Sequence, residues 1–125
     1  MKHSKATWRM LGITTILSSA LITTTVAAKA QEVTVGILVP LTGELGEFGQ
    51  IVADSIELGI AEINDAGGTK CGMIRSVVGD TSGNAEIGLR RATKMIEADG
   101  AVALLGPTSS VMVALVDLAK RTKTV

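Results

Sequence analysis

The fold is decided by residues 33–50, which read VTVGILVPLTGELGEFGQ. Its first seven residues are almost continuously apolar and rich in β-branched side chains, a pattern typical of a strand buried on both faces of a parallel sheet. Pro40 ends this strand, because proline lacks the amide hydrogen that a central ladder needs. A loop rich in Gly, Thr and Glu follows over residues 41–49. Ligands of open α/β sheets bind at the carboxyl ends of the strands, so we expect this loop to lie where a small molecule docks.

Residues 1–30 differ from the rest of the chain and have the order of a secretory signal peptide. A basic start with Lys2, Lys5 and Arg9 precedes an uncharged, mostly apolar stretch over residues 10–26, and Ala28-Lys29-Ala30 is a small-x-small cleavage signal. An uncleaved membrane anchor is the alternative, since residues 10–28 approach the roughly 20 residues that span a bilayer. Serines and threonines dilute this stretch, which favours cleavage and export.

The residues after position 30 carry eight basic and twelve acidic side chains, a net charge of −4. Such a chain has no basic footprint for nucleic acid. The only histidine, His3, lies in the expected signal peptide, which leaves no Cys-His or Ser-His pair and no zinc ligand set after it. The glycine spacings of dinucleotide and phosphate loops are also absent. We therefore expect a binding protein rather than an enzyme, with no metal and no cofactor.

The remaining hydrophobic pattern alternates between strands and helices. Further strands are expected at residues 73–78 and 101–105, and Thr124-Val125 is expected to begin a fourth. Helices are expected at residues 48–64, 85–98 and 111–120. This β-α-β-α-β-α order predicts an α/β fold with a parallel sheet and right-handed crossovers. The apolar helix faces are expected to contain Val52, Ile56, Gly59, Ile60 and Ile63 in the first helix, and Leu89, Ala92, Met95 and Ile96 in the second.

Two strand-end loops contain the candidate ligand-binding residues. Thr108, Ser109 and Ser110 stand at the start of the third helix, where free amides and the helix dipole suit a carboxylate. Serine and threonine are also ordinary N-caps, so a purely structural role stays open. Phe48 either packs as a staple at a helix start or forms an apolar wall beside a ligand. Asp80, just past the second strand, is expected to cap or to bind loop amides.

These pieces together resemble a known family. The matching segments are VTVGILVPLTGELGEFGQ, then GIAEINDAGG, then Asp80, then MIEADGAVALLGPTSS, and the resemblance covers residues 33–120. The chain resembles the N-terminal part of periplasmic solute-binding proteins of the branched-chain amino acid type, which feed ABC importers. The resemblance implies a type I periplasmic binding protein with two lobes that close on a small solute. It also implies that Thr108, Ser109 and Ser110 hold the α-carboxylate and amine of an amino acid, with Phe48 as the apolar wall.

The resemblance further implies a periplasmic location and a membrane permease of an ABC importer as partner. Family members are about three times as long, so residues 31–125 are expected to form an incomplete N-terminal lobe after a signal peptide over 1–30. We expect such a product to be poorly stable and to bind no leucine, isoleucine or valine measurably. A sensor domain of a receptor, a binder of amides, urea or other solutes, and an enzyme with its catalytic groups elsewhere stay open as alternatives.

Overall fold

The computed structural model describes residues 31–125, so the expected signal peptide lies outside the described residues. The elements alternate as the sequence predicts: β1 (Glu32–Val39), α1 (Gly46–Asp65), β2 (Met73–Asp80), α2 (Ala85–Glu97), β3 (Ala101–Leu105) and α3 (Ser109–Thr122). Within residues 31–125, no helix combines the length and the apolar character that a membrane crossing requires.

The three strands form one parallel sheet in the order β2-β1-β3. β1 occupies the centre, and its residues from Thr34 to Val39 are all buried. This is the burial that an almost continuous apolar run predicts. Val39 pairs with Asp80, and Ile37 pairs with Leu105, so the three strands end at one edge of the sheet. The expected α/β fold class is confirmed.

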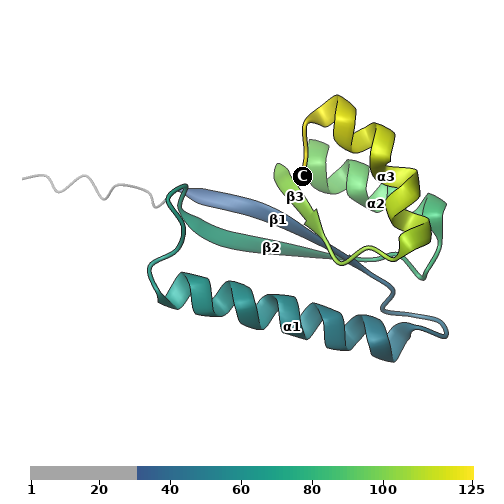
Figure 1. The fold of residues 1–125 in the computed structure, drawn as a ribbon, viewed down its shortest axis with the longest axis horizontal. Helices are drawn as coiled ribbons and strands as arrows, with labels where there is room; N and C mark the ends of the chain where they lie inside the picture. The colour runs from purple at the N-terminus through teal and green to yellow at the C-terminus, as the bar shows by residue number, and fades with distance from the viewer. Residues whose placement is uncertain (1–30) are drawn as a thin grey trace, which may run out of the picture.

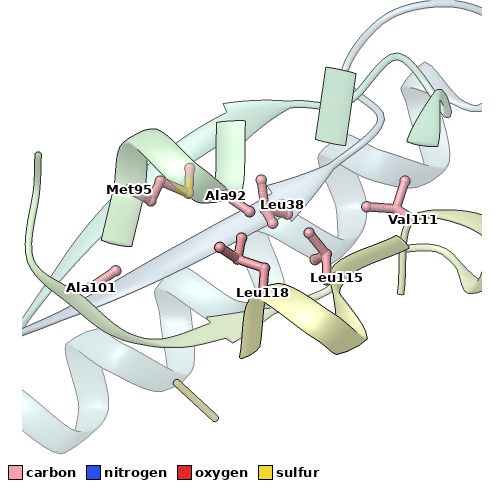
Figure 2. Packing of buried hydrophobic residues seen from close by; sticks show 7 residues of the cluster. All are labelled: Leu38, Ala92, Met95, Ala101, Val111, Leu115 and Leu118. Atoms are coloured by element: carbon pink, nitrogen blue, oxygen red, sulfur yellow. The ribbon is translucent and has the colours of Figure 1, made fainter. Parts of the chain in front are cut away.

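The helices cover both faces of the sheet, with α1 on one side and α2 and α3 on the other (Figure 1). Under α1, Ile37 and Val39 pack with Ala53 and with the half-buried Val52, Ile56 and Ile60. The opposite core joins β1, β3, α2 and α3, and Figure 2 shows its side chains converging between these elements. Its buried members are Leu38, Ala92, Met95, Ala101, Val111, Leu115 and Leu118.

Two residues expected in the core lie partly in solvent instead. Leu89 is 37% exposed and Ile63 is 41% exposed. In α2, the buried Gly88 packs directly against α3, and an added Cβ there would overlap the methyl groups of Val111. This close approach turns Gly88, Ala92 and Met95 inward and leaves Leu89 at the margin. The 3.6-residue period of the sequence indicates which residues share one face of a helix. The packing of the neighbouring helix determines which residues of that face are most buried.

Several element boundaries also differ from expectation by one or more residues. β2 continues to Asp80 rather than ending at residue 78, because Leu38 and Val39 of β1 extend the ladder to Gly79 and Asp80. α1 begins at Gly46, and α3 begins at Ser109 and runs to Thr122. Ser109 and Ser110 therefore belong to the first turn of a helix rather than to a loop.

The described sheet has three strands, and at the position of the expected fourth strand Val125 hydrogen-bonds to β3. Its amide donates to the carbonyl oxygen of Val102 at 3.1 Å, and its carbonyl oxygen accepts from the amide of Leu104 at 2.7 Å. In a parallel ladder, one residue bonds to two residues of the neighbouring strand, and these two are separated by a single residue. Val102 and Leu104 are such a pair. Val125 thus pairs with the edge of β3 that faces away from β1.

Candidate ligand-binding site

Three loops follow the three strands at the carboxyl edge of the sheet. They connect β1 to α1, β2 to α2 and β3 to α3, and the register described above places their starting points side by side. This edge is where ligands bind in open parallel sheets. The candidate residues of the sequence lie in these loops or in the first helical turn after them.

Asp80 connects the first two loops through both of its carboxylate oxygens. Oδ1 accepts from the amide of Leu41 at 2.9 Å and from the amide of Ser82 at 2.7 Å. Oδ2 accepts from the hydroxyl of Thr42 at 2.7 Å and from the hydroxyl of Ser82 at 3.2 Å. The Thr42 and Ser82 hydroxyls also lie 2.8 Å apart. The expectation that Asp80 binds loop amides is confirmed, and its contact with Thr42 adds a link between loops.

These contacts determine the protonation of the carboxyl group. Partial burial acts to raise the pKa of Asp80, but the hydrogen bonds from Thr42, Ser82 and Leu41 outweigh it and lower the pKa from 3.8 to about 2. All four donors favour the ionised carboxylate, because it can only accept hydrogen bonds. Asp80 is therefore an anion across the range in which proteins are folded and active.

The loop after β1 is anchored again where α1 begins. Gly49 is buried, and an added Cβ would overlap the carbonyl oxygen of Pro40. The Gly49 amide also donates to the carbonyl oxygen of Leu45 at 2.8 Å. Phe48 precedes this anchor, is 58% exposed and belongs to neither buried core cluster. Its ring is therefore mostly exposed to solvent.

The loop after β3 lies against β1 and α1. Gly106 adopts a φ of +79°, and an added Cβ would stand 3.0 Å from Val39 Cγ1 and 3.5 Å from Val52 Cγ1. Side chains rarely tolerate this conformation, whereas glycine adopts it readily. The β3–α3 loop therefore passes close to the second and third turns of α1, one turn or more after Phe48.

The start of α3 is open to a ligand. Thr108 is the N-cap by backbone conformation, but its side chain makes no capping hydrogen bond. Its hydroxyl lies 3.5 Å from that of Ser110 instead. Ser109 and Ser110 are exposed. The first amides of a helix have no partner within the helix, so hydroxyls and amides are available together at the positive end of the helix dipole.

The structure groups some of the predicted site residues more closely than others. Thr108 and Ser110 are neighbours, with Ser109 between them. Within residues 31–125, no hydrogen bond connects them to the first turn of α1, where Phe48 lies. Two grooves border the turn at Ser82, the smaller between the first two loops and the larger along α2. One of about 260 Å³ is lined by Thr42, Glu44, Leu45, Ser82 and Gly83, and one of about 460 Å³ by Asp80, Ser82, Ile87, Arg90, Arg91 and Lys94.

Sequence reasoning missed Thr42 and Ser82. Both are small hydroxyl residues in turns, a common composition that does not distinguish them. The signal that could have found them is the parallel register: once Val39 is paired with Asp80, the residues after each strand become neighbours. Among residues 31–125, no three His, Cys, Asp or Glu side chains are grouped as metal ligands, and Cys71 is an exposed free thiol.

Comparisons with known proteins agree with this architecture. The sequence profile of the family described as periplasmic binding protein matches residues 32–125. The Leu/Ile/Val-binding protein BraC3 of Rhizobium johnstonii is 30% identical over 79 residues, which are 63% of this chain and 21% of that protein.

Two solved structures show the same fold. The substrate-binding protein LivJ of Streptococcus pneumoniae, in complex with isoleucine, has a TM-score of 0.70 at 24% identity, over 74% of this chain and 27% of its own. A solute-binding protein of Rhodopseudomonas palustris, in complex with 3,4-dihydroxybenzoic acid, has a TM-score of 0.66 at 24% identity, over 75% and 26%. The chain thus spans about a fifth to a quarter of the length of these proteins. From the profile match over residues 32–125, the chain belongs to the periplasmic binding protein family.

Proposed function

We propose that residues 31–125 form one wall of the solute-binding cleft of an exported protein that delivers a small amino acid to an ABC importer. The cleft edge is the carboxyl edge of the sheet. Residues 1–30 serve as the signal peptide for export to the periplasm, and residues 31–125 belong to the N-terminal lobe. The partner in the membrane is the importer's permease.

One observation carries the choice of ligand. The N-terminus of α3 presents the exposed Ser109 and Ser110 hydroxyls, and the Thr108 side chain does not cap it. A carboxylate placed there accepts hydrogen bonds from hydroxyls and first-turn amides and gains from the helix dipole. Amino acids carry such a carboxylate, and the name of the Rhizobium relative supports leucine, isoleucine or valine as the class.

Phe48 supplies the apolar contact in this proposal. Its ring is more than half exposed at the start of α1, and the β3–α3 loop passes close to the same helix through Gly106. An exposed aromatic ring at the start of α1, together with a carboxylate site at the start of α3, suits a ligand with a short aliphatic side chain. The relatives are four to five times as long as the matched part, so we propose that further protein closes the other side.

A chimera tests the proposal directly. Residues 31–125 replace the matching segment of the Rhizobium protein, and leucine, isoleucine, valine and 3,4-dihydroxybenzoate are titrated into this Rhizobium chimera by calorimetry. We expect one of the three amino acids to bind. Ser109→Ala and Ser110→Ala should each weaken binding by about 1–3 kcal/mol, since a charge-assisted hydrogen bond is lost.

The control variant is Ser55→Ala, which removes an exposed hydroxyl of α1 that donates to the carbonyl oxygen of Ile51. It should leave the affinity unchanged. Unchanged affinity in both Ser109→Ala and Ser110→Ala would remove these residues from the site. Micromolar binding of an amino acid by residues 31–125 alone would contradict the proposal that this segment is one wall of a larger cleft.

A further inference from the structure

Asp80 ties two of the cleft-edge loops together through four hydrogen bonds. Its hydrogen bonds reach Leu41 and Thr42, which lie 39 and 38 residues earlier in the sequence. The same carboxylate holds the amide and the hydroxyl of Ser82 in its own loop. Ser82 has a φ of +48°, in the left-handed region that serine seldom occupies. One side chain thus fixes the conformation of one loop and attaches it to the next.

The attached segment is short and is fixed at both ends. Leu41 and Thr42 are bound by Asp80 at its start, and Gly49 rests against the Pro40 carbonyl at its end. Phe48 stands immediately before this second anchor and has no core packing of its own. Phe48 belongs to α1, so the helix carries its ring, and the two anchors hold the segment that leads into this helix.

We propose that Asp80 is a positioning residue for solute binding, which acts through Leu41 and Thr42 to hold the β1–α1 loop, just before the helix that carries Phe48, at the cleft edge. This inference rests on the proposed function, but the attachment itself can be measured without a ligand. It assigns Asp80 no contact with solute. The side chain of Thr42 and the turn at Ser82 also line the 260 Å³ groove between the two loops, so the attachment shapes that groove.

The test is amide hydrogen exchange, followed by NMR on the exported full chain, in Asp80→Ala, Asp80→Asn and Thr42→Val. In Asp80→Ala we expect exchange at Leu41 and Ser82 to rise about tenfold or more, because local opening governs exchange at such sites. The amides of Ile37 and Leu38 in the centre of β1 should keep their protection. Asp80→Asn retains one acceptor oxygen and should restore part of the protection, which distinguishes positioning from a general loss of stability.

Asp54→Ala is the matched control, because Asp54 is an exposed acid on α1 that accepts a single side-chain hydrogen bond from Gln50. Thr42→Val keeps the test informative if Asp80→Ala does not fold, and it should raise exchange at Leu41 by a smaller factor. The proposal is overturned if exchange at Leu41 and Ser82 rises no more than in the control, or if it rises together with exchange at Leu38. Absence of amino acid binding would count against the proposed function alone.

Discussion

The packing of α3 against α2 makes a sharp prediction about Val111. Its side chain is fully buried between the two helices (Figure 2), and its methyl groups occupy the space where a Cβ at Gly88 would stand. Val111→Ala removes two methyl groups, worth about 1.6 kcal/mol of burial. With the cavity left behind, the total loss of unfolding free energy should be about 2–3 kcal/mol.

Gly88→Ala perturbs the same contact from the other side. The new methyl group would overlap Val111 Cγ1 and cost about 1–3 kcal/mol through overpacking. Replacing a helical glycine by alanine stabilises the helix by about 1 kcal/mol, because alanine has the higher helix propensity. The net loss should therefore be roughly 0–2 kcal/mol.

The double variant Gly88→Ala/Val111→Ala should be more stable than the sum of the two losses. The new methyl group at position 88 fills the space vacated at position 111, and the remaining Cβ of residue 111 lies at an ordinary contact distance of 3.4 Å. We expect its stability to fall within about 1 kcal/mol of the unsubstituted chain, a coupling of roughly 1 kcal/mol or more.

Urea unfolding followed by circular dichroism at the helix band measures these differences, since residues 31–125 contain no Trp or Tyr to report by fluorescence. Gly59→Ala is the control, because nothing lies within 4 Å of its added Cβ, and it should show no coupling to Val111→Ala. Losses that add within about 0.5 kcal/mol in the double variant would refute the packing described for the start of α3.

Three further outcomes follow from the loops. Gly49→Ala should destabilise the chain by about 1–3 kcal/mol, because its methyl group meets the Pro40 carbonyl rather than a movable side chain; urea unfolding would show it. Asn84→Ala removes a side chain that accepts from two amides in the first turn of α2 and should cost about 1 kcal/mol in the same assay. The lowered pKa of Asp80, about 2 against 3.8, contributes stability above pH 4 that is lost as the pH falls toward 2. Solvent exposure limits that contribution to about 1 kcal/mol, and Asp80→Asn should abolish it.

The sequence predicted the sheet well because β1 and β3 carry local signals. β1 is a continuous apolar run that ends at Pro40, and β3 is a short apolar run between two glycines. Both patterns indicate a strand without knowledge of the neighbouring strands. The core faces of the helices were less predictable. The exposure of Leu89 depends on how closely α3 approaches Gly88. A local sequence pattern gives no information on the distance between two helices.

The site was predictable in its location but not in its connections. Parallel strands end at one edge of a sheet, so the order of the elements alone indicates the loops that follow the three strands. The bond between Thr42 and Asp80 spans 38 residues and depends on a register that hydrophobic patterns leave open. Thr108 is the N-cap of α3 although three hydroxyl residues compete for that position, and only backbone conformation distinguishes them.

The most direct test of the central claim is an NMR titration of the Rhizobium chimera with isoleucine, in which amide shifts are mapped onto residues 31–125. If these residues form one wall of a solute cleft, the largest shifts will appear at Ser109 and Ser110 and in the loop that leads to Phe48. The turn that pairs Thr69 with Gly72 lies before β2, at the amino edge of the sheet, and should not respond. Saturable shifts confined to that turn, or isoleucine binding with no shift at Ser109 and Ser110, would contradict the account.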